Sequence, residues 1–208
     1  MSVPTFKFNV ASWKWQVSSL ICACMLLLSG CSSSSTSLNY YLLHSTAYSA
    51  SVQKSDSPVS LTIDKLVIPE YLKQRGLVYQ ISETNIHIST KHLWAEPLDE
   101  GIFKVLRSEL SQRNIKLMKQ TDYARGTLPN AKARISLVIN DFISTYNGDV
   151  VFSGEYVVTS GEVSLGHRPF VFNAPLQNDG FDASVKAMRS ALTQLSEQIK
   201  QDMKSLSQ

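Results

Sequence analysis

The most reactive side chains in this sequence are its three cysteines, because a thiolate is a strong nucleophile. Cys22 and Cys24 lie within an apolar stretch near the N-terminus, and Cys31 follows that stretch after two small residues. If the stretch is removed on export, Cys31 is the only thiol left and no disulfide can form within the chain. A single exported thiol is a reactive liability unless it is chemically occupied. We therefore expect Cys31 to carry a covalent group.

The residues before Cys31 are typical of an export signal. Lys7 and Lys14 precede the apolar residues 17–28, which as a helix would span roughly 18 Å, short of the ~30 Å hydrocarbon core of a bilayer. The stretch ends in Leu-Ser-Gly-Cys, which resembles the bacterial lipobox. We predict cleavage between Gly30 and Cys31, with a diacylglycerol and an N-acyl chain on Cys31. The alternatives are a plain cleaved signal and a buried core helix.

The residues after Cys31 bear on where the protein is held. Two or more acyl chains anchor a protein stably to a bilayer. Ser32 stands where an Asp favours retention in the inner membrane, so it suggests the periplasmic face of the outer membrane. A Ser- and Thr-rich run follows and is typical of a flexible tether. The predicted organisation is a signal peptide over 1–30, a lipidated cysteine and tether over 31–37, and a single periplasmic domain over 38–208.

No constellation of catalytic, metal-binding or nucleic-acid-binding residues is recognisable. Residues 148–154 superficially resemble a phosphate loop, but Glu155 and Tyr156 stand where Lys and Ser or Thr are required. There is no Gly-x-Ser-x-Gly motif and, after the signal, no cysteine that could serve as a metal ligand. The formal charge of +3 includes two lysines of the signal, and no basic block remains without them. The four histidines are scattered: His44, His87, His92 and His167. We expect neither an enzyme nor a metal site.

Hydrophobic periodicity predicts the elements that build the domain. Strict alternation favours strands, and apolar residues three and four apart favour helices. Strands are predicted over 38–43, 59–68, 77–81, 86–89, 115–118, 135–146, 150–159 and 168–174, and helices over 97–110 and 182–206. This order predicts an α/β fold: a mixed, mostly antiparallel sheet with a mid-chain helix and a long C-terminal helix packed on it.

Turn residues predict how the strands are joined. Asn147-Gly148 is a strong hairpin signal, and residues 83–85 join another strand pair. Gly161 and Gly166 are predicted to frame a further turn. A helix between strands 86–89 and 115–118 would allow one right-handed parallel crossover. Residues 44–58 and 119–132 are predicted loops.

A few aromatic residues have both a structural and a functional interpretation. Trp94, just before the mid-chain helix, is either a core residue or a partner contact. Around the predicted hairpin, Phe142, Tyr146 and Phe152 are either core residues or contacts in an oligomer. We name Trp94, Tyr146 and Phe152 as possible partner or oligomer contacts. The apolar stripe of the C-terminal helix is predicted to be core, because its polar face has mixed charge.

Eight segments, in one order along the mature chain, resemble a known family. They are 39–43 (NYYLL), 68–72 (IPEYL), 76–80 (GLVYQ), 93–99 (LWAEPLD), 141–150 (DFxxxYNGDV), 153–156 (SGEY), 168–170 (RPF) and 179–182 (DGFD). Together they resemble the ABC-type transport auxiliary lipoprotein family, and within it the PqiC-like lipoproteins of the paraquat-inducible Pqi system. Residues 44–58 and 119–132 match least.

The resemblance implies a non-enzymatic docking lipoprotein of an MCE-type intermembrane lipid transport system that supports envelope integrity. The implied partners are a PqiB-like MCE protein and, indirectly, a PqiA-like inner-membrane protein, with copies of the lipoprotein forming a homo-oligomeric ring. No cofactor is implied besides the lipid on Cys31. The alternative is a periplasmic carrier that binds lipid in its own cavity. A hydrolase is a third hypothesis, and the missing nucleophile constellation speaks against it.

Overall fold

The computed structural model describes residues 37–44, 58–120 and 133–205. Leu38–Gln208 forms one compact unit. Its elements, in chain order, are β1 (Asn39–Tyr41), β2 (Val59–Val67), η3 (Glu70–Lys73), β3 (Gly76–Ser82), β4 (Asn85–Trp94), α2 (Leu98–Gln112), β5 (Ile115–Lys119), β6 (Ala133–Ser144), β7 (Asp149–Ser160), β8 (Val163–Pro175) and α3 (Phe181–Ser205). The predicted strands and both helices are confirmed, with ends shifted by a few residues.

The eight strands form one mixed sheet with β6 at its centre. One edge of β6 pairs with β7, and the other pairs with β2 along its first half and with β3 at its end. The two longest ladders, β6–β7 and β7–β8, are antiparallel, as is β3–β4, whereas β1–β4, β2–β5, β2–β6 and β3–β6 are parallel. The predicted mixed, mostly antiparallel sheet is therefore confirmed.

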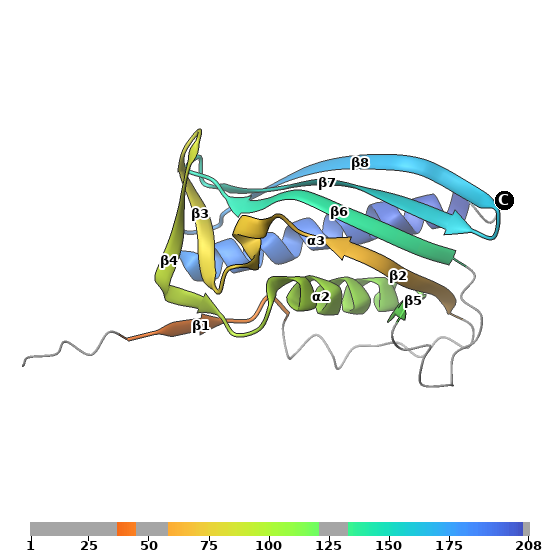
Figure 1. Cartoon of the computed structure of the whole chain (residues 1–208), viewed down its shortest axis with the longest axis horizontal. Helices are drawn as coiled ribbons and strands as arrows, with labels where there is room; N and C mark the ends of the chain where they lie inside the picture. Colours follow the sequence, from red (N-terminus) through yellow and green to blue (C-terminus); the bar gives the residue numbers. More distant parts are fainter. Residues whose placement is uncertain (1–36, 45–57, 121–132, 206–208) are drawn as a thin grey trace, which may run out of the picture. The chain divides into compact units, whose positions relative to one another are not determined.

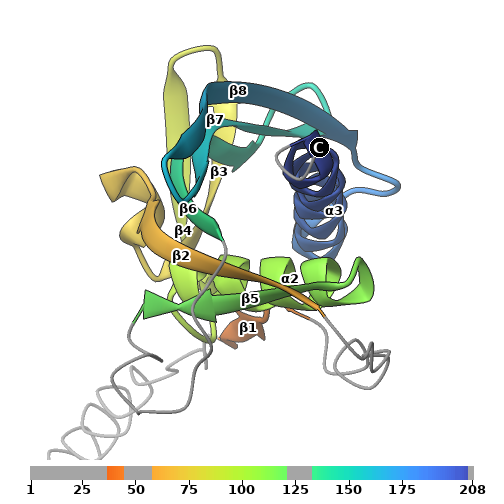
Figure 2. The ribbon, with the colours of Figure 1, turned by 90° about the vertical axis from the view of Figure 1, so that its right-hand side faces the viewer.

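The sheet curves around the two helices and encloses the core. Figure 1 shows α3 running along the inner side of β6, β7 and β8, and Figure 2 shows α2 and α3 closing the open side of the curved sheet. The α3 stripe is buried, as predicted, because apolar residues recur every three or four positions. Its members include Val185, Met188, Leu192, Leu195 and Ile199. Burial of this stripe against the sheet is the main link between the C-terminal helix and the rest of the domain.

The predicted hairpins are confirmed, and glycine explains two of the turns. Gly148 has a φ of 83°, and its N–H donates to the carbonyl oxygen of Thr145, so a type I turn ends in a left-handed glycine. Gly161 has a φ of 59° and is the first of two turn residues between β7 and β8. A side chain at either position would strain the backbone.

Two predicted connections were wrong. The helix α2 does not make a parallel crossover: β5 pairs in parallel with β2, whereas β4 pairs with β3 and runs antiparallel to β3, β6, β2 and β5. β5 pairs with β2 because the edge of β2 had unpaired backbone groups, and the Val59 N–H also donates to the Asn114 carbonyl oxygen just before β5.

The second wrong prediction concerns Gly166. It does not frame the β7–β8 turn but lies within β8, where an extra residue between Ser164 and His167 forms a bulge. The predicted loops over 44–58 and 119–132 lie almost entirely outside the described residues.

Candidate functional site

The candidate residues predicted from the sequence fall into three groups: outside the described residues, buried, and exposed. Cys31 and Gly30, the predicted lipidation and cleavage positions, lie outside the described residues. Trp94 and Phe152 are buried, with 5% and 0% exposure, so in this domain they pack in the core and do not face a partner. Tyr146 is 53% exposed in the β6–β7 turn. Of the three aromatic candidates, only Tyr146 is available at the surface.

Phe152 belongs to a line of aromatic rings that fills the core beneath β6, β7 and β8. Its ring centroid lies 4.6 Å from that of Phe142 and 4.9 Å from that of Phe170. Phe142 and Phe152 are fully buried directly opposite one another on β6 and β7. Such pairs stabilise a sheet beyond the area they bury. The structural interpretation of Phe142 and Phe152 therefore holds.

An apolar surface lies at the end of the sheet where the β3–β4 hairpin and the β6–β7 turn meet. The pairing of Tyr79 with Ser144 brings the two loops together. We call this surface the apolar tip, and it consists of Ile81, Ile86, Ile88 and Tyr146, which are 40–53% exposed. Figure 1 shows the β3–β4 hairpin standing above the neighbouring strands at this end. Sequence reasoning found Tyr146 but missed the isoleucines, because their alternation with polar residues indicated a half-buried strand.

A cluster of rings holds this end of the domain in place. The ring of Phe181, the first residue of α3, stacks on His92 with centroids 3.9 Å apart and meets Tyr79 edge-on at 5.6 Å. Tyr79 also lies 5.1 Å from His87 across the β3–β4 ladder. The Tyr41 hydroxyl is 2.8 Å from Nδ1 of His92, which ties β1 to the same cluster. The hairpin is thus supported by β1 and α3, and not only by its own ladder.

The chain that leaves β1 is fastened to α3 by one arginine. The Arg189 guanidinium donates to the carbonyl oxygens of Leu43, Leu42 at 2.9 Å and His44 at 3.4 Å. Burial lowers the pKa of Arg189, and the Asp182 carboxylate opposes that shift. Leu43 is 1% exposed and packs directly on Gly101 of α2, where an added Cβ would lie 3.0 Å from the Leu43 Cβ. These contacts attach the first residues of the domain firmly to α2 and α3.

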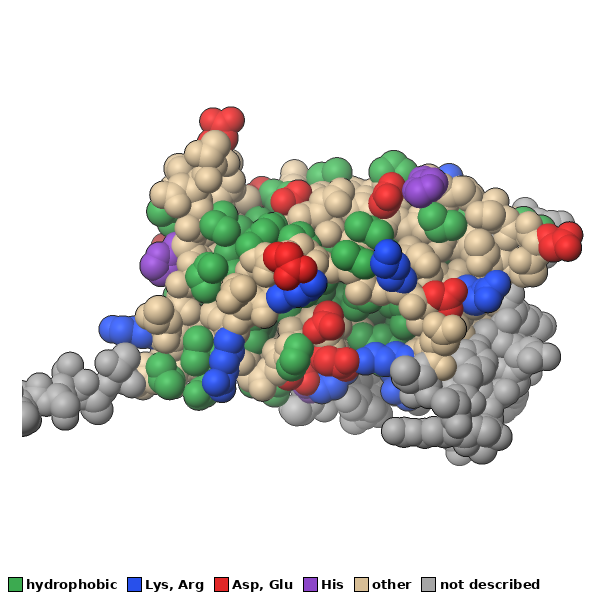
Figure 3. Space-filling view, viewed as in Figure 1, with side chains coloured by type: hydrophobic (Ala, Val, Ile, Leu, Met, Phe, Trp, Pro, Cys, Tyr) green, Lys and Arg blue, Asp and Glu red, His purple; other side chains and the backbone are tan. Residues whose placement is uncertain are grey.

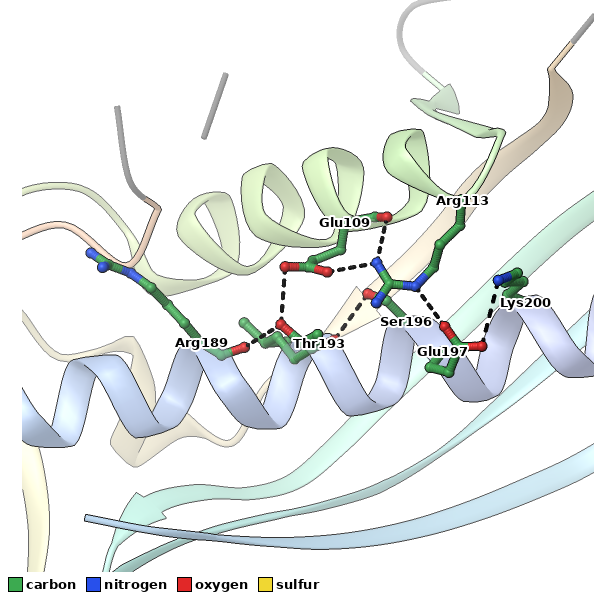
Figure 4. Close-up of polar contacts among 8 residues, drawn as sticks. Glu109, Arg113, Arg189, Thr193, Ser196, Glu197 and Lys200 are labelled. Carbon is green, nitrogen blue, oxygen red and sulfur yellow. Dashed lines mark hydrogen bonds and ion pairs between the residues drawn. The ribbon is translucent and has the colours of Figure 1, made fainter. Parts of the chain in front are cut away.

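A polar network joins α2 to α3 (Figure 4). Arg113 donates from Nη1 to Glu109 at 2.6 Å and from Nε to Glu197 at 2.9 Å. The Thr193 hydroxyl donates to the other Glu109 oxygen at 2.9 Å, and Lys200 lies 3.6 Å from Glu197. The Glu109 side chain is only 4% exposed. The hydrogen bond from Arg113 is the largest cause of the lowered pKa of Glu197. These contacts lie within or between the two helices, as expected of a structural network.

The partly buried Tyr71 and the fully buried Tyr156 make similar structural contacts. Burial, followed by the Asp141 carboxylate, raises the pKa of Tyr71 to about 12, and Asp141 also accepts a 2.6 Å hydrogen bond from Ser153. The Tyr156 hydroxyl donates to Asp202 at 2.6 Å, and burial is the largest cause of its strongly raised pKa. Both hydroxyls keep their protons at neutral pH. Neither tyrosine is poised as an acid or a base near pH 7.

The side-chain clusters of the described residues and one hollow between two elements bear on what the domain could bind. Among residues 37–44, 58–120 and 133–205, no group of three His, Cys, Asp or Glu side chains is placed to hold a metal ion. A hollow of about 220 Å³ between β2 and α2 is lined by charged side chains that include Asp64, Lys65, Glu100 and Lys119, and by the apolar side chains of Ile63, Leu66 and Phe103. Ligand cavities are usually larger and mostly apolar. None of the helices in the described ranges is long and apolar enough to cross a bilayer.

The chain belongs to the ABC-type transport auxiliary lipoprotein family, whose profile matches residues 41–200. It is a family of transport auxiliaries and not of enzymes. The chain is 30% identical to the intermembrane transport lipoprotein PqiC of Escherichia coli K12 over 93% of its own length and 98% of the relative's. It matches the PqiC of Shigella flexneri equally well. The resemblance inferred from the eight segments is confirmed.

Solved structures support the same fold. A crystal structure of an uncharacterized protein is 26% identical, with a TM-score of 0.66 over 80% of this chain and 99% of that one. A protein of Xanthomonas campestris is 14% identical, with a TM-score of 0.53 over 69% of this chain and 82% of that one, and shows the fold alone.

Proposed function

We propose that this chain is the docking lipoprotein of an MCE-type intermembrane lipid transport system, anchored by Cys31 to the periplasmic face of the outer membrane. It receives a PqiB-like MCE protein and, through it, works with a PqiA-like inner-membrane protein. Several copies surround the partner as a ring. Kinship with PqiC, an intermembrane transport lipoprotein in two bacteria, supports this role.

The observation that carries the proposal is the apolar tip. Soluble proteins rarely gather several exposed aliphatic and aromatic side chains on one projecting hairpin unless the surface is covered by a partner. The tip lies at the start of β4, and the other end of β4 pairs with β1, the first strand after the tether. Ten extended residues span about 30 Å. The tip is thus held well away from the point where the anchored chain enters the domain.

Acidic substitutions in the tip are expected to abolish capture of the MCE partner. In the variant that combines Ile86→Asp and Ile88→Asp, two carboxylates face the partner on one side of β4 and their desolvation opposes docking. Pull-down of the tagged, detergent-solubilised mature protein measures how much PqiB-like protein is recovered. We expect recovery from wild type and none from the variant, with circular dichroism unchanged.

The matched control is Val163→Asp with Val171→Asp, which places two acids on exposed positions of β8, 58% and 69% accessible. This control should recover the partner as well as wild type does. Equal recovery from all three proteins would contradict a docking role for the tip. Failure of the wild type to recover any partner would contradict the proposed function itself.

The carrier hypothesis is the second candidate, and the described hollow does not favour it. Its lining mixes charged and apolar side chains, and its volume is too small for a whole phospholipid. Phospholipid that co-purifies with the domain after detergent-free extraction would favour the carrier over the dock.

A further inference from the structure

The outer face of β1 is apolar although β1 is an edge strand. Side chains alternate between the two faces of a strand. Leu38, Tyr40 and Leu42 point outward and are 46%, 51% and 38% exposed, whereas Leu43 is 1% exposed. Exposed edges of sheets usually carry charged or polar side chains. Three large apolar residues in alternation therefore indicate a surface that is covered by something.

Basic side chains flank this apolar face. Tyr40 pairs with Leu93 of β4, so both side chains lie on the same side of the sheet. The Arg75 guanidinium lies 5.4 Å from the Tyr40 ring centroid, within range of a cation–π interaction. Lys91, two residues before Leu93, is exposed on the same side by alternation. Figure 3 shows hydrophobic and basic side chains together at the β1 end of the domain.

We propose that this outer face, defined by Leu38, Tyr40, Leu42, Arg75 and Lys91, lies against the headgroups of the phospholipid bilayer that holds Cys31. Tyrosine favours the interfacial region of a membrane, and Arg and Lys are attracted to anionic headgroups. This assignment rests on the proposed function, because it requires the anchor at Cys31. It adds an orientation of the domain that the anchor alone does not fix.

The length of the tether supports this occupant over any other. Leu38 lies seven residues after Cys31, and even fully extended this stretch reaches at most about 25 Å. The face is therefore held permanently close to the bilayer, where a weak attraction acts at high effective concentration. The bonds from Arg189 to the carbonyls after β1 make this strand rigid with the domain. Contact of β1 with the membrane consequently orients the whole sheet and directs the apolar tip away from the lipid.

A tryptophan in place of Tyr40 tests this orientation. Mature acylated protein carrying Tyr40→Trp is reconstituted in phosphatidylethanolamine–phosphatidylglycerol vesicles, with and without brominated acyl chains, and vesicle-bound protein is isolated by flotation. The mature chain has Trp94 as its native tryptophan, and because it is only 5% exposed it is shielded from the bromines and adds the same unquenched emission to every variant. We expect the introduced indole to show blue-shifted emission in plain vesicles. We expect the intensity of that emission to be quenched in vesicles with brominated chains. The matched control, Val171→Trp at a 69% exposed position of β8, should keep its emission.

The outcomes separate this inference from the proposed function. Flotation with equal quenching of the two variants would overturn the membrane-facing assignment and leave the anchor intact. Blue-shifted emission of the Tyr40→Trp variant in unacylated Cys31→Ala protein, free of vesicles and detergent, would mean that a second copy covers the face, and would also overturn the membrane-facing assignment. Failure to float would overturn the anchor at Cys31, and the orientation with it.

Discussion

Cys31→Ala is expected to lose acylation completely and to leave the membrane fraction. Each buried methylene of an acyl chain contributes about 0.8 kcal/mol, and a protein with two or more chains stays bound where one chain gives only marginal binding. None of the helices in the described part of the mature domain could replace that anchor by spanning the bilayer. Labelling with a clickable palmitate analogue and fractionation of lysed cells measure the two effects.

The chain offers a matched control for this variant. Cys24→Ala removes a thiol only seven residues away, within the predicted signal, and should leave both labelling and fractionation unchanged. Membrane association of Cys31→Ala equal to that of wild type would refute the anchor.

Arg113→Ala is expected to lower the free energy of unfolding by about 3–5 kcal/mol, the usual cost of removing one partner from a buried ion pair. The Glu109 carboxylate, 4% exposed, would keep its hydrogen bond from Thr193 but lose the guanidinium 2.6 Å away. Urea denaturation measures the change. Lys186→Ala is the control, because Lys186 and Asp182 form an exposed pair and such pairs contribute less than about 1 kcal/mol. Equal destabilisation by the two variants would contradict a structural role for the α2–α3 network.

The same network predicts how stability responds to acid. Arg113 lowers the pKa of Glu197 in the folded protein below its usual value of 4.5. A carboxyl group whose pKa is depressed on folding contributes stability above its unfolded-state pKa and loses it as pH falls through the folded value. Wild type should therefore lose this contribution below about pH 4.5. Arg113→Ala should show a shallower loss in that range, and an identical pH profile would argue against the coupling.

Strands and hairpins were predictable from the sequence where the pattern of neighbouring residues determines them. The alternation of Ile135, Leu137 and Ile139 and the turn at Asn147-Gly148 predicted the β6–β7 hairpin correctly, because hairpin register depends on nearby residues. The parallel pairings of β1 with β4 and of β5 with β2 were not predictable. They join residues about 50 positions apart, and no local signal specifies which free edge a strand will choose.

The surfaces and networks were predictable only in part. Tyr146, in the β6–β7 turn, and Phe152, within β7, were equally good candidates from the sequence, yet Phe152 is fully buried and Tyr146 is half exposed. Phe152 is buried because its ring packs against those of Phe142 and Phe170, whereas Tyr146 lies in a turn at the end of the sheet. The contact between Arg113 and Glu197 spans 84 positions and that between Arg189 and Leu42 spans 147. Isolated charges on a helix normally indicate a solvated face, so neither contact could be inferred from its neighbours.

Intact-mass spectrometry of the protein extracted from purified membranes tests the central claim most directly. We predict a chain that begins at Cys31 and carries the mass of a thioether-linked diacylglycerol and one amide-linked acyl chain. A chain that begins at residue 31 without added mass, or one that still contains residues 1–30, would contradict it.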